Sequence, residues 1–173
     1  LLLKVVARIS DQGAAPLSPP REEDRQLSLF DMPPALGPLF DATPDFTAQL
    51  ARVAAEAPGC SLAGVFLTHA HVGHYTGLMN LGREAMGASD VPVWAMSRMR
   101  DYLTKNGPWS QLVNLHNITL RPLEADTTVR LSDSLLVTPF AVPHRDEYSE
   151  TVGFRIASNR GVVVFVPDID KWD

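Results

Sequence analysis

Three of the five histidines in the chain fall within the short stretch "LTHAHVGHY" at residues 67–75. They are His69, His71 and His74, and they follow the almost entirely apolar segment "SLAGVF". Neutral imidazole binds zinc, iron and copper, and a His-x-His pair on a turning backbone can direct two rings at one point. His74 lies three residues after His71, so it can face the same point from the first turn of a helix. This spacing favours a metal site over a polar loop that happens to be rich in histidine.

Two further apolar segments end in residues that bind metals. His144 follows "TPFAVP", and Asp168 follows "VVVFVP" with Asp170 two residues later. We predict that His144 and Asp168 are ligands, because three separate strands would then end in side chains suited to one ion. Asp170 is interpreted as a turn or cap residue, and as the alternative ligand if the register is shifted by two. His116, in "VNLHNIT", has no partner pattern and is interpreted as structural.

The composition limits both the class of protein and the kind of metal site. The 173 residues are 45% hydrophobic and 20% charged, as in an ordinary globular domain. The single Cys60, interpreted as a half-buried turn thiol, excludes an intramolecular disulfide and a thiolate zinc cluster. A net charge of -5, without a block of lysine and arginine, argues against a nucleic-acid partner. No apolar run reaches the roughly 18 residues of a membrane span, so no membrane partner is expected.

The ends of the chain and its compartment are less well defined. The chain lacks an initiator methionine and opens inside an apolar pattern, which is typical of a fragment or a processed form. The opening "LLLKVV" is too short for the core of a signal peptide. The compartment is not determined, although the cytoplasm is slightly favoured. A small-molecule substrate is the expected partner, and the oligomeric state stays open.

The order of elements divides the chain into an N-terminal segment, 1–38, and a domain, 39–173. Residues 1–9 suit a strand, and the proline-rich residues 10–38 suit a long loop or linker. In the domain, strands at 39–43, 61–69 and 91–96 alternate with helices at 43–57, 72–86 and 97–107. A turn of helix at 109–116 precedes strands at 117–124, 127–132, 135–144, 151–158 and 161–168.

Apolar positions within the helices predict which faces are buried. Thr43 can cap the first helix, and Ser97 can cap the third. Helical spacing predicts one buried stripe in the first helix and another in the second. The residues of these stripes are Phe46, Leu50, Val53 and Ala54, and then Leu78, Leu81 and Met86.

The same order predicts the layers of the fold. The all-apolar strands need cover on both faces, whereas the alternating strands near the C-terminus need one face in water. A sheet with helices on its outer side, packed on a second sheet, satisfies both requirements. The sequence therefore predicts an α/β sandwich with the histidines at the carboxyl ends of strands, where α/β proteins usually place their sites.

These residues resemble the metallo-β-lactamase fold superfamily. The family signature, T-H-x-H-x-D-H after a buried strand, is similar to "THAHVGH" at 68–74. The segments "LFDAT", "TPFAVPH" and "VVVFVPD" are similar to further strands of the family and occur in the same order, over about residues 36–170. The resemblance implies an αββα sandwich that is incomplete at its C-terminus. "HAHVGHYTGL" is also similar to proteins of the pyrroloquinoline-quinone biosynthesis B type.

The resemblance also implies a role for each candidate residue. The first metal ion would be held by His69, His71 and His144. His74 would bind a second ion, and Asp168 would bridge the two. Asp41 would orient the site through hydrogen bonds without binding metal.

The sequence departs from the family pattern in two places. Gly73 stands where the family has an aspartate that binds the second metal, and the family's last histidine has no counterpart before Asp173. Either the chain is truncated or its second site is deficient. The sequence thus leaves open whether one or two zinc ions are bound, and iron remains the alternative to zinc.

The expected activity is that of a metal-dependent hydrolase. A metal-bound hydroxide would attack an ester, lactone, amide or phosphodiester, with Asp168 as the catalytic carboxylate that takes up the proton. One alternative is an iron-dependent oxygenase-like or cofactor-biosynthesis protein of the pyrroloquinoline-quinone B type. Another is a non-catalytic scaffold with a vestigial site. Arg145 and Tyr148 either line the pocket mouth or belong to an exposed polar loop, and Tyr75 is either a pocket wall or part of the core.

Overall fold

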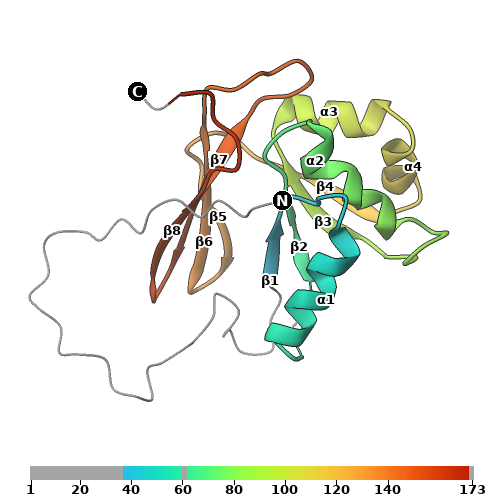
Figure 1. Cartoon of the computed structure of the whole chain (residues 1–173), viewed down its shortest axis with the longest axis horizontal. Coiled ribbons are helices and arrows are strands. Elements are labelled where there is room, and N and C mark those ends of the chain that lie inside the picture. The colour runs from blue at the N-terminus through green and yellow to red at the C-terminus, as the bar shows by residue number, and fades with distance from the viewer. Residues whose placement is uncertain (1–36, 60–61, 172–173) are drawn as a thin grey trace, which may run out of the picture.

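The computed structural model describes residues 37–59 and 62–171, which form two four-stranded sheets (Figure 1). The strand predicted at 1–9, the proline-rich residues up to 36 and Cys60 lie outside the described residues. The first sheet is parallel, in the order β1 (Gly37–Phe40), β2 (Leu62–Phe66), β3 (Val91–Ala95) and β4 (Ile118–Pro122). The second is antiparallel, in the order β5 (Val129–Ser132), β6 (Leu135–Ala141), β7 (Val152–Ser158) and β8 (Gly161–Phe165).

Helices cover the outer face of the first sheet, as predicted (Figure 1). They are α1 (Phe46–Glu56), the short α2 (Val72–Tyr75) with the 3-10 helix η2 (Thr76–Leu81), α3 (Ser97–Lys105) and α4 (Trp109–Asn114). Over the second sheet the described part of the chain places no helix. Within the same residues, no helix is both long enough and apolar enough to cross a membrane.

Two apolar cores hold these layers together. Between the helices and the first sheet, the side chains of Phe46, Leu67, Leu78 and Leu103 are fully buried. Between the two sheets, Phe66 stacks on Trp94 with ring centroids 4.5 Å apart and meets Phe154 edge-on at 5.7 Å. Burying a large apolar side chain contributes about 1.5–3 kcal/mol, so both faces of the first sheet contribute to the stability of the domain.

The helices differ from the predicted ones at their ends. The second helix ends at Leu81, where Gly82 adopts an extended conformation, so Met86 is exposed and not part of the buried face. Ala54 is also exposed, since Phe46 is the one residue of α1 that is fully buried, where it packs beside Gly77 of η2. Ser97 is the first residue of α3, and its side chain makes no cap. α1 begins at Phe46 with Asp45 at its N-cap position, so Thr43 lies before the helix and is not its cap. The Thr43 hydroxyl accepts a hydrogen bond from the Asp45 amide at 3.3 Å.

One edge of the molecule collects the carboxyl ends of four strands. β1 and β2 run parallel, and β6 and β8 are parallel to each other because both pair with the antiparallel β7. The Val152 amide donates a hydrogen bond to the Thr68 carbonyl at 3.1 Å, which joins the two sheets at this edge. Loops that leave β1, β2, β6 and β8 therefore meet at one place.

Candidate metal centre

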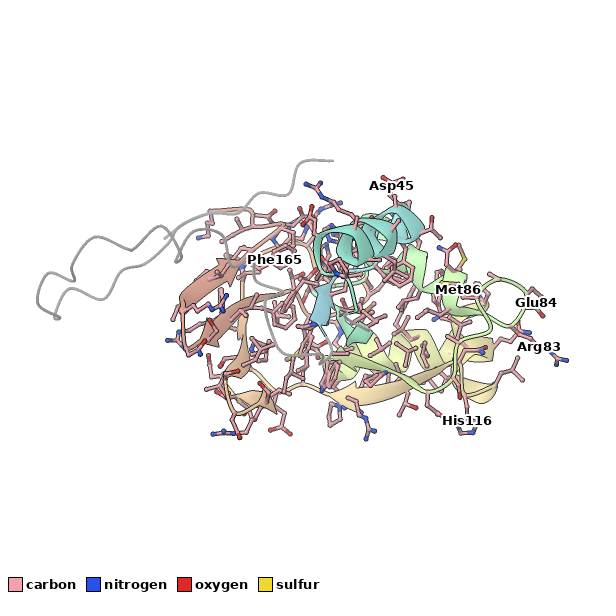
Figure 2. The ribbon with its side chains drawn as sticks, turned by 90° about the horizontal axis from the view of Figure 1, so that it is seen from below. Asp45, Arg83, Glu84, Met86, His116 and Phe165 are labelled. Atoms are coloured by element: carbon pink, nitrogen blue, oxygen red, sulfur yellow. The ribbon has the colours of Figure 1, made fainter. Side chains whose placement is uncertain are left out.

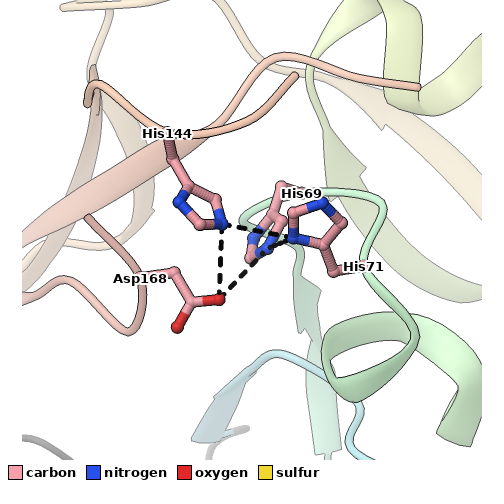
Figure 3. Close-up of side chains that lie close together, drawn as sticks. All are labelled: His69, His71, His144 and Asp168. Atoms are coloured by element: carbon pink, nitrogen blue, oxygen red, sulfur yellow. Dashed lines mark hydrogen bonds and ion pairs between the residues drawn. The ribbon is translucent and has the colours of Figure 1, made fainter. Parts of the chain in front are cut away.

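Four side chains converge at this edge: His69, His71, His144 and Asp168 (Figure 3). Each offers one ligand atom, and these atoms all lie within 4.8 Å of one another. His69 Nε2 is 2.8 Å from His71 Nδ1, which is 3.2 Å from His144 Nε2. Asp168 Oδ2 lies 3.5 Å from His69 Nε2 and 3.6 Å from His144 Nε2. Ligands of a tetrahedral ion with bonds of about 2.1 Å are about 3.4 Å apart, so these separations suit one metal ion.

The outward nitrogens of two of these rings face carboxylates. His71 Nε2 donates to Glu147 Oε2 at 3.0 Å, and His144 Nδ1 donates to Asp170 Oδ1 at 2.7 Å. The hydrogen bond from His71 lowers the pKa of Glu147, which keeps this carboxylate charged and able to accept. Because the outer nitrogens carry the protons, the inner nitrogens of both rings present lone pairs to the centre.

The third ring is oriented by a hydroxyl group. The Thr68 hydroxyl donates to the Asp41 carboxylate at 2.9–3.0 Å, so its oxygen can accept from His69 Nδ1 at 2.9 Å. This arrangement leaves His69 Nε2 without a proton. Burial, together with the neighbouring rings and Arg145, lowers the pKa of His69 to about 2. His69 is therefore a neutral imidazole, the form that binds a metal.

The resulting centre brings together acceptors and no donors. Three inner nitrogens with lone pairs point at one another and at the Asp168 carboxylate, within hydrogen-bond distance but without a proton to share. Lone pairs at such distances repel unless a cation lies between them. Three neutral imidazoles and one carboxylate are also a ligand set that zinc accepts. The donor set therefore fits the metal ion that the sequence predicts.

His74 lies beside this group and faces two carboxylates. Its Nδ1 donates to Asp41 Oδ2 at 2.7 Å, and its Nε2 lies 3.3 Å from Asp168 Oδ2. Burial disfavours the charged ring, but the two carboxylates outweigh it and hold the pKa of His74 above its ordinary value. Asp41 itself is buried and has a positive φ of 60°, an uncommon conformation that occurs at functional sites.

Residues 39–173 match the model of a family described as "Beta-lactamase superfamily domain". The chain belongs to this family. Its fold is that of the metallo-β-lactamase superfamily, as the residues around "THAHVGH" predict. A search of curated proteins gives no significant match.

The solved structures that are similar to the chain include two that align over more than two thirds of it. Zn²⁺-bound PqqB from Methylobacterium extorquens aligns with a TM-score of 0.63 and 19% identity, over 79% of this chain and 50% of that one. A diphosphatase from the PhnP family aligns with a TM-score of 0.50 and 21% identity, over 69% of this chain and 44% of that one. The chain thus spans about half the length of these β-lactamase superfamily structures, and at these identities the likeness concerns the fold.

The structure of this superfamily member brings together most of the predicted site residues. His69, His71, His144 and Asp168 form one group, with His74 next to Asp168. The role of His74 as a ligand of a second ion stays a prediction. Gly73 has no positive φ, and a Cβ added there meets nothing within 4 Å.

Other candidates lie outside the group of ligands. Asp170 is not a mere turn residue, because its carboxylate orients His144. Tyr75 is buried in the core, and Arg145 and Tyr148 are exposed on the loop after His144. His116 lies at the periphery of the molecule, where it is exposed near Asp90 (Figure 2).

Some contacts of the centre have no signal in the sequence. Ser149 is buried, and its Oγ accepts a hydrogen bond from the Ala70 amide at 2.8 Å. Ala70 lies in the sequence between His69 and His71. Glu147 reaches His71 from a loop that is distant in sequence. The run "HRDEYSE" shows many polar residues but not which of them turns inward, because this depends on the conformation of the loop.

Proposed function

We propose that the chain is a metal-dependent hydrolase with one ion held by His69, His71, His144 and Asp168. The observation that supports this proposal is the convergence of three proton-free ring nitrogens and a carboxylate at separations of 2.8–3.6 Å. An ion-free role would leave these acceptors facing one another inside a folded domain. Such a vestigial arrangement has no physical reason to keep each ring oriented by its own oxygen partner.

The chain's own residues supply the rest of the chemistry. A divalent ion bound here would lower the pKa of a coordinated water from about 15.7 toward 7 and polarise the bond under attack. Asp168 is partly exposed, at 38%, so its carboxylate can accept a proton from water at the open side of the centre. His74 donates to Asp168 and is held in turn by Asp41, which fixes the position of the carboxylate. Esters, lactones, amides and phosphodiesters are the substrate classes that suit this chemistry.

Zinc is the ion that we propose. Three neutral imidazoles and a carboxylate suit a tetrahedral zinc site. Zinc is also the ion in the PqqB structure whose fold the chain shares. The same ligands suit iron, so an iron-dependent or cofactor-biosynthesis role of the PqqB type is the second candidate. The fold likeness over 79% of this chain favours that candidate over the scaffold.

Hydrolysis of a panel of substrates tests this proposal. We expect the zinc-loaded chain to cleave at least one activated ester, lactone, amide, phosphodiester or β-lactam. Activity should disappear with chelator and return with zinc. His144→Ala should be inactive, whereas the matched variant His116→Ala, far from the centre, should keep full activity. Failure of the whole panel, with oxygen consumption by the iron-loaded chain, would favour the PqqB-type role.

A further inference from the structure

The loop between β6 and β7, residues 142–151, carries both the ligand His144 and Glu147, which orients a second ligand. The loop has no helix or strand, and residues 145–148 are exposed. An exposed irregular segment usually has several accessible conformations. Holding a metal ligand and its partner in place therefore requires contacts from outside the loop.

Arg98, in the first turn of α3, makes several such contacts. Its Nη1 donates to Asp146 Oδ2 at 3.2 Å, and its Nη2 donates to the Asp146 carbonyl at 2.7 Å and to the Glu147 carbonyl at 3.5 Å. A guanidinium presents several donors in a rigid plane, so one side chain can fix a stretch of backbone. Arg98 therefore holds the backbone at the residue whose carboxylate binds His71.

Glu150 makes the reverse contact from the loop to the helix. The backbone amide of Arg98 donates to both Glu150 carboxylate oxygens, at 3.2 and 3.1 Å. The first amides of a helix have no partner within it, and a negative charge is favourable at this end. Glu150 therefore caps α3 from outside, a role in which the Ser97 side chain takes no part. The guanidinium of Arg98 and the carboxylate of Glu150 together clamp the loop to the helix.

A second anchor ties the same loop to the histidine motif. Ser149 is buried, and its Oγ accepts from the Ala70 amide at 2.8 Å. Ala70 lies between two of the ligands, so the loop is fixed to the motif at Ser149 and to α3 at residues 146 and 147. Glu147 is thus held at its own carbonyl by Arg98 and two residues later by Ser149, with its Oε2 3.0 Å from His71 Nε2.

We infer that Arg98 is a positioning residue of the metal centre and acts through Glu147. By holding the Asp146–Glu147 backbone, Arg98 keeps the Glu147 carboxylate on His71 Nε2, which leaves His71 Nδ1 directed at the ion. None of these contacts of the Arg98 guanidinium involves the side chain of a ligand. This inference rests on the proposed metal centre, because it assigns Arg98 to the support of one of its ligands.

Zinc affinity of variants of the full chain tests this role. We expect Glu147→Ala to weaken binding about 10–100-fold, as is usual for the partner of a ligating histidine, and Arg98→Ala about 10-fold. Because Arg98 acts through Glu147, the double variant should bind no more weakly than Glu147→Ala alone. Arg52→Ala removes an exposed arginine that pairs with Glu56 on α1, and it should bind as the wild type does. Affinity is measured by competition with a chromophoric chelator.

Two further measurements separate positioning from folding. The metal-free Arg98→Ala chain should unfold close to the wild-type temperature, because the contacts of the Arg98 guanidinium with Asp146 and Glu147 are all exposed. Its Co²⁺-loaded form should show a shifted visible absorption band, and Arg98→Lys should restore part of the zinc affinity. If Arg98→Ala binds zinc like the wild type, or if its loss multiplies with that of Glu147→Ala, the inference about Arg98 is wrong. If the wild type itself binds no zinc, the metal centre is rejected as well.

Discussion

Two His–Asp pairs in the chain differ in almost everything except their residue types. Asp41 and His74 are buried and joined by a 2.7 Å hydrogen bond, whereas Asp90 and His116 are 60% and 79% exposed and lie 3.5 Å apart. Both aspartates have a positive φ, 60° for Asp41 and 50° for Asp90. The backbone conformation of the two aspartates therefore does not distinguish the pairs, whereas their surroundings do.

The surroundings follow from the position of each pair on the first sheet. Asp41 follows the carboxyl end of β1, where Thr68 and the histidine motif supply it with three hydrogen-bond donors. Asp90 precedes β3, at the amino ends of the parallel strands. There Thr119 donates a hydrogen bond to it, and water reaches the rest of the carboxylate. The comparison shows that the pair beside the candidate metal centre is the one to which neighbouring strands deliver further polar groups.

The largest difference should appear when each aspartate is replaced by alanine. Asp41→Ala removes the acceptor of the buried Thr68 amide, of the Thr68 hydroxyl and of His74 Nδ1. We therefore expect a loss of about 3–5 kcal/mol in the free energy of unfolding. Asp90→Ala should lower the free energy of unfolding by less than about 1 kcal/mol. This value excludes the strain of placing alanine at a positive φ, which both variants share. Chemical denaturation of both variants measures the difference. Similar losses would show that burial does not distinguish the pairs.

Replacing histidines should change zinc affinity in only one region. His71→Ala removes a ligand, so we expect more than about 100-fold weaker binding, beyond the range for residues that merely support a ligand. His116→Ala should leave the affinity unchanged, because His116 lies at the far edge of the sheet. Titration calorimetry of the metal-free variants gives both values. Equal weakening by the two substitutions would mean that the ligands have been assigned wrongly.

A smaller effect is expected at Gly73, which precedes His74. A second ion would find only His74 and Asp168 there, and two ligands rarely suffice where three or four are usual. Gly73→Asp adds a carboxylate in open space without a positive φ, so we expect the zinc content to rise toward two per chain. Gly73→Ala, which adds no ligand, should leave it unchanged. Two tightly bound ions in the wild type would contradict this account.

Much of the fold, and the meeting of the candidate ligands at one place, could be predicted from the sequence. His144 and Asp168 could be found because each ends an apolar strand, and strands of one sheet bring such ends together. The buried faces could be predicted only where a helix is continuous. Helical spacing therefore assigned Met86 wrongly, because the chain leaves the helix at Gly82.

Of the supporting contacts, only those of Asp41 could be predicted, through the resemblance to the family. The sequence indicates a turn or cap residue at Asp170, or an alternative ligand, whereas in the structure its carboxylate orients His144. Glu147 and Arg98 lie in a loop and a helix whose mutual position depends on the whole fold, and spacing carries no record of such contacts. A pattern of residues along the chain thus indicates what reaches the ends of the strands. The orientation of each ring depends on the polar group that the fold places beside it: Thr68 for His69, Glu147 for His71 and Asp170 for His144.

The metal content of the wild-type chain tests the central claim most directly. Protein purified without chelator is analysed for zinc and iron, together with His71→Ala as a variant that lacks one ligand. We expect about one zinc per wild-type chain and little in His71→Ala. A wild-type chain that contains no metal, even after reconstitution with zinc or iron, would contradict the assignment of His69, His71, His144 and Asp168 as a metal centre.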